Sequence, residues 1–195
     1  VEYRLVEAMN SKSWMPKEKV KILVAPTYSE STEGEDELVA WIAQLAGLAR
    51  TKNWLVDVAL HPGAKPRVEK LVKKHAKLTP RINGVTTNEL LNYSVVVTDF
   101  SGIAHDALLL GIPTISVLVD FDNYQDFCPS LVDQDQKDVA YVVNNINNLQ
   151  TQLELAIGSD PLASAREAYV NKAVNGLLAL PGVNTRESVL SALDD

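Results

Sequence analysis

The stretch from Val95 to Val117 constrains the fold of this chain more than any other. It opens with a β-branched run, passes a short polar turn at residues 98–102, and continues as an apolar helical pattern that ends at Gly111. A second β-branched run follows Pro113. This order predicts a strand, a turn, a helix and a strand, which together form one βαβ unit of a parallel sheet.

The turn at residues 98–102 has the chemistry of an anion site. We expect Ser101 to cap the following helix through its hydroxyl, and Gly102 to let another group approach the backbone closely. The first N–H groups of a helix have no partner inside it, and the helix dipole favours negative charge there. The turn therefore predicts a binding site for an anion, above all for a phosphate.

Composition excludes several classes of protein. The net charge of −7 over 195 residues disfavours bulk binding of nucleic acid. Cys128 is the only cysteine, which excludes an internal disulfide framework and a cysteine-built zinc site. No apolar run has the length of a membrane span, and no signal peptide is visible. Because the first residue is Val1 rather than methionine, we expect a part of a longer protein.

Strand and helix patterns alternate along the chain, which predicts a doubly wound, Rossmann-like α/β sheet. Near-continuous apolar runs indicate buried strands, and apolar residues at helical spacing indicate helices. The expected strands are 20–27, 54–60, a weak 81–83, the run from 95 to the turn at 98, and the β-branched run that follows Pro113. The expected helices start near 38, 64, 87 (capped by Thr86 or Thr87), 103, 137, 161 and 185, the sixth and seventh covering 161–180 and 185–193. Residues 28–36 are expected to form a polar loop. The helix that starts at 64 is expected to reach 77, and the helix that starts at 137 is expected to reach 157. Residues 1–19 are expected to be a short helix and a linker, followed by one domain over 20–195.

Polar or small residues follow the end of every expected strand. In doubly wound sheets, ligands bind outside the carboxyl ends of the strands. We therefore favour a ligand site over the simpler explanation that loops are polar. The residues in question are Thr27 to Ser29, His61, Asn83 with Gly84, residues 98–102, and residues 120–124.

Individual side chains at this edge have two interpretations each. His61 either donates to a phosphate oxygen or moves a proton, or it caps a strand end. Asp106 lies one helical turn beyond the turn, within reach of a ribose hydroxyl, or is a favourable charge near a helix start. Asp99 is expected to bond the backbone of its own turn. His105 and His75 are expected to be packing or surface residues.

One segment is strongly basic. Only Glu69 opposes its cations, and the common interpretation of such a run is a solvated face. The alternative is contact with anionic lipid or an anionic polymer. The cations are Lys65, Arg67, Lys70, Lys73, Lys74 and Lys77.

Several motifs are absent from the sequence. It holds no Walker P-loop and no GxGxxG, so neither P-loop NTP hydrolysis nor dinucleotide redox chemistry is supported. It also holds no GxSxG and no HExxH. We expect no metal and no cofactor.

The segment VVVTDFSGIAHDALLLGIPTISVLVDFDNY resembles the "TDYSS…FD" region of CDP-glycerol glycerophosphotransferases, the teichoic-acid primases and polymerases. ILVAPTY, VALHP and PGVNTRESVLSAL resemble further parts of the same C-terminal half, in order. The resemblance implies the donor-binding half of a GT-B fold. It also implies a cytoplasmic location, at the inner face of the bacterial membrane if the basic segment binds lipid.

The resemblance assigns roles to residues of this chain. Ser101 and the N–H groups of Gly102 and Ile103 would hold the donor diphosphate, within a donor-binding turn that begins at Thr98 and Asp99. His61 would be the catalytic group, stabilising charge or donating a proton. The remaining donor-binding positions would be Asp106 near the ribose and Thr27 in the cleft.

The chain departs from the family pattern in three places. Gly102 replaces a second serine, Ser29 stands where an arginine often follows, and the segment after Tyr124 lacks an Arg-Gly loop. The turn also resembles that of UDP-GlcNAc 2-epimerases. Another nucleotide-sugar enzyme and a non-catalytic binding module therefore remain as alternatives.

The implied reaction is transfer of glycerol phosphate from CDP-glycerol to a polyol-phosphate acceptor of the teichoic-acid type, with release of CMP. The acceptor's general base would lie in an N-terminal domain outside this chain. We expect the chain alone to bind nucleotide weakly and to show little or no turnover.

Overall fold

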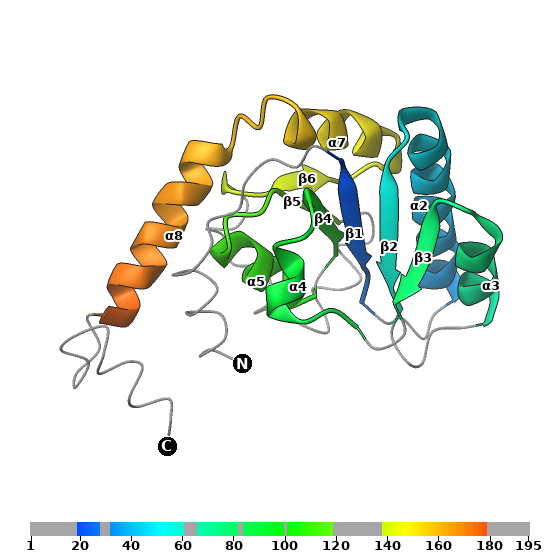
Figure 1. The fold of residues 1–195 in the computed structure, drawn as a ribbon, viewed down its shortest axis with the longest axis horizontal. Coiled ribbons are helices and arrows are strands. Elements are labelled where there is room, and N and C mark those ends of the chain that lie inside the picture. Colours follow the sequence, from blue (N-terminus) through cyan, green and yellow to red (C-terminus); the bar gives the residue numbers. More distant parts are fainter. Residues whose placement is uncertain are drawn as a thin grey trace, which may run out of the picture.

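The structure, a computed structural model, describes residues 19–27, 32–60, 66–81, 84–99, 101–118 and 138–178. Its centre is a six-stranded parallel sheet in the order β3-β2-β1-β4-β5-β6 (Figure 1). The strands are β1 (Lys21–Ala25), β2 (Leu55–Ala59), β3 (Leu78–Arg81), β4 (Val95–Thr98), β5 (Thr114–Val117) and β6 (Tyr141–Val143). The expected doubly wound α/β sheet is confirmed.

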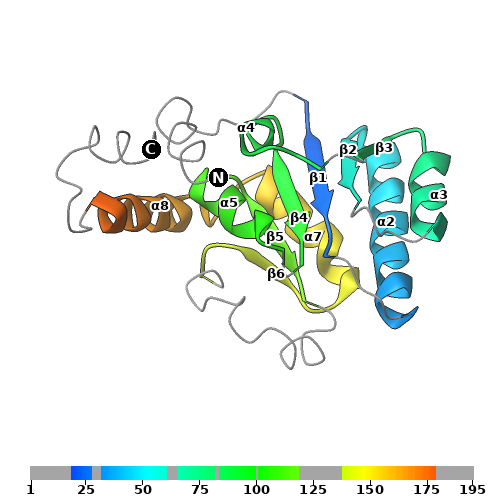
Figure 2. The same ribbon diagram turned by 90° about the horizontal axis from the view of Figure 1, so that it is seen from below.

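Helices cover both faces of the sheet (Figure 2). One face carries α2 (Thr32–Lys52), α3 (Pro66–Lys74) and α7 (Leu149–Ile157), the last preceded by the 3-10 turn η2 (Ile146–Asn148). The other face carries α4 (Thr87–Leu90) and α5 (Ile103–Leu109). The long helix α8 (Ala163–Leu178) packs against α5 and extends beyond the sheet (Figure 1).

Burial on both faces explains the apolar runs of the central strands. Alternate side chains of a strand point to opposite faces, so Ile22 and Val24 pack in the core under α2 and α7, whereas Leu23 packs under α4 and α5. The strand β4 follows the same rule, with Val95 and Val97 on one side and Val96 on the other. A strand that is buried on both faces is therefore apolar at most of its positions.

The core on the α4 side contains a polar cluster that ties three segments together. The carboxylate of Asp57 in β2 is buried, accepts a hydrogen bond from the Tyr93 hydroxyl (2.7 Å) and pairs with the Lys21 ammonium (2.9 Å). The same ammonium lies 4.8 Å from the centre of the Tyr93 ring. Burial and the neighbouring Asp57 raise the pKa of Tyr93 well above its usual value. A buried charge needs such partners, so this cluster fixes β1, β2 and the approach to β4.

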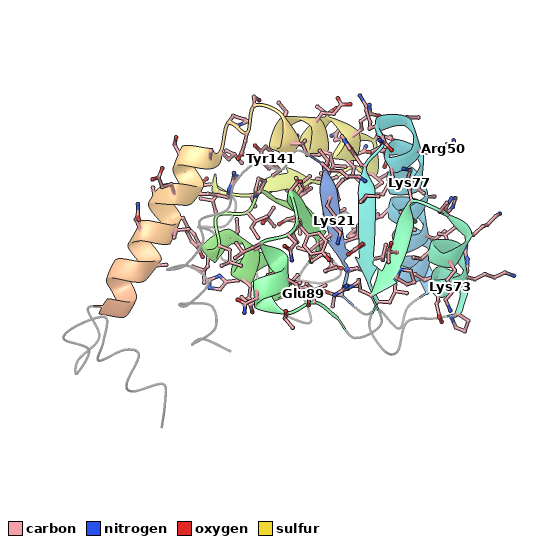
Figure 3. The ribbon with its side chains drawn as sticks, viewed as in Figure 1. Lys21, Arg50, Lys73, Lys77, Glu89 and Tyr141 are labelled. Carbon is pink, nitrogen blue, oxygen red and sulfur yellow. The ribbon has the colours of Figure 1, made fainter. Side chains whose placement is uncertain are left out.

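A second polar group holds α4 at the end of β3. The carboxylate of Glu89 accepts hydrogen bonds from the backbone N–H and the hydroxyl of Thr86, both at 2.9 Å. It also pairs with Arg81, the last residue of β3. Figure 3 shows Glu89 on this helix. The predicted cap at Thr86 is confirmed, and these bonds lower the pKa of Glu89.

The predicted helix over residues 137–157 is wrong in its first half. Tyr141–Val143 is an edge strand paired with β5, and helical structure starts at η2 before α7. Buried Tyr141 and Val143 alternate as in a strand, and this short pattern also fits helical spacing. The Asn145 side chain then accepts the N–H of Asn147 (3.0 Å) and starts a new turn.

Other predicted boundaries move by a few residues. The weak strand lies at Leu78–Arg81 rather than 81–83, and α2 already begins at Thr32, inside the expected polar loop. The helix expected over 64–77 occupies Pro66–Lys74, and α8 begins at Ala163, two residues after Pro161. The helices expected near the two ends of the chain fall outside the described residues, so the domain boundary at residue 20 stays a prediction.

None of the described helices is both long and apolar enough to cross a membrane.

Candidate functional site

The candidate site lies where β1 and β4 end side by side at the centre of the sheet (Figure 1). The chain leaves β1 towards one face and β4 towards the other, which makes this the switch point at which doubly wound sheets bind ligands. Ala25 and Thr98 are the last paired residues of the two strands. We therefore centre the candidate site, which the sequence predicts at the carboxyl edge of the sheet, on the ends of β1 and β4.

Asp99 joins the two strand ends directly. Its carboxylate accepts the backbone N–H of Thr27 on both oxygens (2.9 Å each) and the Thr27 hydroxyl on one of them (2.5 Å). We had expected Asp99 to bond its own turn, but these bonds reach the neighbouring strand end. A carboxylate that accepts several hydrogen bonds gives charge-assisted contacts, which are stronger than neutral ones.

Thr98 lies inside the sheet rather than at its surface. Its side chain is fully buried, and its hydroxyl donates to the carbonyl of Ala25 at 2.6 Å. Through this bond Thr98 adds a second tie between β4 and β1. Its side chain therefore contributes to the site by fixing the geometry of the two strand ends.

The amino end of α5 stands directly beside this clamp. Gly102 is the cap residue of the helix, with φ −55°, and no side chain caps the helix end. The expected cap by the Ser101 hydroxyl is therefore wrong: it is the Ser101 carbonyl that takes part, accepting the N–H of Ala104 (3.0 Å). The backbone turns directly into the helix at Gly102, so the serine side chain is not needed to start it.

Three polar groups at this helix end have no hydrogen-bond partner within the described part of the chain. They are the Ser101 hydroxyl and the N–H groups of Gly102 and Ile103. Gly102 is exposed, and a Cβ added to it would meet no atom within 4 Å. Donors arranged in this way at a helix start can bind an anion that approaches from solvent.

Asp106 lies in the first turn of α5. Its carboxyl group is half-buried and has no hydrogen-bond partner among the described residues. Burial raises the pKa of this carboxyl, while the neighbouring His105 acts in the opposite direction. A half-buried carboxylate without a partner destabilises the fold, and such groups are typical of functional sites.

The remaining predicted residues lie away from the clamp or outside the described residues. His105 is exposed on α5, and its Nδ1 lies 3.2 Å from the Tyr169 hydroxyl on α8. His75 follows α3 and is half-buried. His61, Tyr28, Ser29, Asn83 and residues 120–124 fall in segments that the structure does not describe. Within its described ranges, no group of three or more His, Cys, Asp or Glu side chains could hold a metal ion.

Sequence reasoning did not find the bonds from Asp99 to Thr27. These two residues are 72 positions apart in the sequence. Their contact can be predicted only when the order of the strands is known, and the pattern of a single strand does not give that order. The one available signal was that both residues follow a buried run immediately.

Comparison with known proteins identifies a family and several similar folds. The sequence matches the family of CDP-glycerol:poly(glycerophosphate) glycerophosphotransferases over residues 2–175. A search of curated proteins finds no match. Similar solved structures include the wall teichoic acid polymerase TagF soaked with CDPG, at 17% identity and a TM-score of 0.52. Others are the glycosyltransferase SnogD from Streptomyces nogalater (14%, 0.57) and a putative UDP-N-acetylglucosamine 2-epimerase from Listeria monocytogenes (13%, 0.53).

These structural alignments cover 88%, 83% and 83% of this chain. They cover only 39%, 42% and 40% of the other three chains. At such low identities the likeness shows the fold alone, and that fold is the Rossmann-like half of a GT-B protein.

Removing the Asp99 carboxylate should destabilise the protein more than removing the Thr27 hydroxyl. In Asp99→Ala the Thr27 N–H loses both its acceptors, which costs about 1–3 kcal/mol of the free energy of unfolding. In Thr27→Val the backbone bonds remain, and the expected cost is about 0.5–1.5 kcal/mol. Urea denaturation of both variants measures the difference. Equal losses would show that the backbone bonds contribute nothing to the clamp.

Replacing Asp106 by asparagine should stabilise the protein in a pH-dependent way. Because burial raises the folded-state pKa of Asp106, the folded state holds this proton more tightly, and wild-type stability falls as pH rises through that pKa. Asparagine is neutral throughout, so Asp106→Asn should gain stability over wild type at pH 7 and lose that gain near pH 3. Urea denaturation at the two pH values measures this. A variant less stable than wild type at pH 7 would contradict it.

Proposed function

Because this chain belongs to the CDP-glycerol:poly(glycerophosphate) glycerophosphotransferase family, we propose that it is the donor-binding half of such a transferase. The supporting observation is the switch point, where the unpartnered donors at the start of α5 stand beside the clamp between Asp99 and Thr27. We propose a cytidine diphosphate donor for two reasons: its diphosphate suits an anion site, and the family description includes CDP-glycerol. The cytoplasmic location stays a prediction.

The donor would be held by groups with separate tasks. Ser101 and the N–H groups of Gly102 and Ile103 would bind the diphosphate, since they lack partners among the described residues and the helix dipole favours negative charge there. Asp106 would bind the ribose, because its carboxylate lies on the same helix and makes no hydrogen bond with any residue in the described ranges. Thr27 would line the cleft, with its backbone held by Asp99.

In the proposed reaction an acceptor hydroxyl attacks the phosphorus that carries the glycerol. A new P–O bond forms to the acceptor, the bond to the CMP phosphate oxygen breaks, and CMP leaves. The acceptor proton passes to a base that we expect outside this chain. Phosphoryl transfer requires mainly positioning and charge stabilisation, which the start of α5 would supply. From the family resemblance, His61 would stabilise or protonate the leaving phosphate.

Two departures from the family pattern leave a second class of donor, a nucleotide sugar, as an alternative. Gly102 replaces a serine and so removes a hydroxyl while keeping an N–H, and Ser29 replaces an arginine. Similar folds occur in a glycosyltransferase and in a putative UDP-N-acetylglucosamine 2-epimerase. A uridine diphosphate sugar is therefore the competing donor, and loss of all nucleotide binding would indicate a non-catalytic module.

Calorimetric titration with CDP-glycerol, CMP and UDP-GlcNAc tests the proposed donor. We expect weak binding of both cytidine ligands and none of UDP-GlcNAc. Ser101→Ala should weaken CDP-glycerol binding about tenfold, or about 1.4 kcal/mol, because it removes the hydroxyl that would bind the diphosphate. Ser164→Ala on α8 is the matched control, because this serine is exposed and lies outside the candidate site.

Selective binding of UDP-GlcNAc would replace the proposed donor with a nucleotide sugar. Equal affinities of the Ser101→Ala and Ser164→Ala variants for CDP-glycerol would show that this ligand binds elsewhere than at the start of α5. Turnover of CDP-glycerol by this chain alone would contradict the proposal that the acceptor's base lies outside it.

A further inference from the structure

The segment from Arg67 to Lys77 concentrates positive charge in an otherwise acidic chain. It carries five cations and one carboxylate, whereas the whole chain has a net charge of −7. We call the exposed cations of α3 together with half-buried Lys77, which follows the helix, the α3 basic surface; the cations of α3 are Arg67, Lys70, Lys73 and Lys74. At physiological ionic strength, charges farther apart than roughly 8 Å are screened, so an approaching ligand senses this local surface rather than the net charge.

The cations of the α3 basic surface differ in their partners. Arg67 pairs with Asp36 on α2 and Lys73 with Glu69, both at 2.5 Å. Lys77 donates to the Asn53 side chain at 2.8 Å. Lys70 and Lys74 are exposed and make no hydrogen bond or ion pair with any described residue. Two adjacent ammonium groups, one helical turn apart, are therefore available to a ligand.

The α3 basic surface offers charge without apolar contact. The apolar residues of α3 face the core, since Val68 and Val72 are buried and Leu71 packs against the same cluster. Among the described residues, the only exposed large hydrophobic is Leu155, on α7. Helices that insert into a membrane interface carry exposed apolar side chains beside their cations, and α3 has none. The carboxylates of Asp36 and Glu69 would also lie against a flat anionic bilayer.

The position of α3 connects this surface with the candidate site. The helix begins after the carboxyl end of β2, the strand next to β1, and leads to the amino end of β3. Its cations therefore form a row that starts near the edge where the donor would bind and runs away from it. Figure 3 shows Lys73 and Lys77 on the α2–α3 side of the molecule, opposite α8.

We propose that the α3 basic surface binds the polyol-phosphate chain of the acceptor, at phosphates some distance from its reacting end. This inference rests on the proposed function, because it takes the acceptor to be a poly(glycerophosphate). A narrow polymer with regularly spaced phosphates can contact Lys70 and Lys74 while avoiding the two carboxylates. Such binding would raise the local concentration of acceptor ends at the site.

The test compares two double variants that change charge equally. Lys70→Glu with Lys74→Glu reverses the unpartnered pair, and Lys19→Glu with Lys172→Glu reverses two exposed lysines outside α3. Affinities of the full chain are measured for a glycerol-phosphate oligomer of about ten units, for a dimer, and for CDP-glycerol. We expect the α3 variant to lose about tenfold or more in affinity for the long oligomer. The dimer and CDP-glycerol should bind it as they bind wild type.

Equal losses in the two double variants, or no loss in the α3 variant, would overturn the inference while CDP-glycerol binding upholds the proposed donor. Failure of wild type to bind CDP-glycerol would instead count against the proposed function. In that case the affinities of the two double variants for the long oligomer would still decide the inference about the α3 basic surface. Sedimentation with phosphatidylglycerol vesicles provides a third comparison. Loss of vesicle binding in the α3 variant, without oligomer binding by wild type, would assign this surface to lipid and overturn the inference.

Discussion

The bonds from Asp99 to Thr27 are the contact on which the geometry of the site depends. The ladder between β1 and β4 ends at Ala25 and Thr98, and beyond this point the chain turns towards opposite faces of the sheet. The Asp99 carboxylate extends the tie past the last paired residues by accepting the Thr27 N–H and hydroxyl. Since α5 starts only a few residues after Asp99, the same contact also sets where that helix begins relative to β1.

The polar residues of this region divide into those that hold the structure and those available to a ligand. Thr98 is buried and bonded to Ala25, and Asp99 is bonded to Thr27. The Ser101 hydroxyl, the first N–H groups of α5 and the Asp106 carboxylate have no partner in the part of the chain that the structure describes. Both kinds of residue come from one short stretch of sequence. The residues that tie β4 to β1 and the unpartnered groups of the candidate site are therefore close neighbours along the chain.

Most of the fold could be predicted because its central strands are buried on both faces and therefore form near-continuous apolar runs, as in residues 95–97 of β4. The strand at Tyr141–Val143 was missed because an edge strand of this length also fits a helical pattern. Ser101 was expected to be a cap because local propensity favours serine there, but the backbone of this turn makes Gly102 the cap residue. The partner of Asp99 could not be predicted at all, because it depends on which strands are neighbours.

We propose that a cytidine diphosphate donor binds at the switch point between β1 and β4. The most direct measurement is a map of backbone amide chemical shifts by NMR during titration with CDP-glycerol. We expect the largest changes in chemical shift at Thr27, Gly102 and Ile103, because these amides would line the site or face the diphosphate. Changes confined to α7 and α8, or no changes near the start of α5 at saturating ligand, would contradict it.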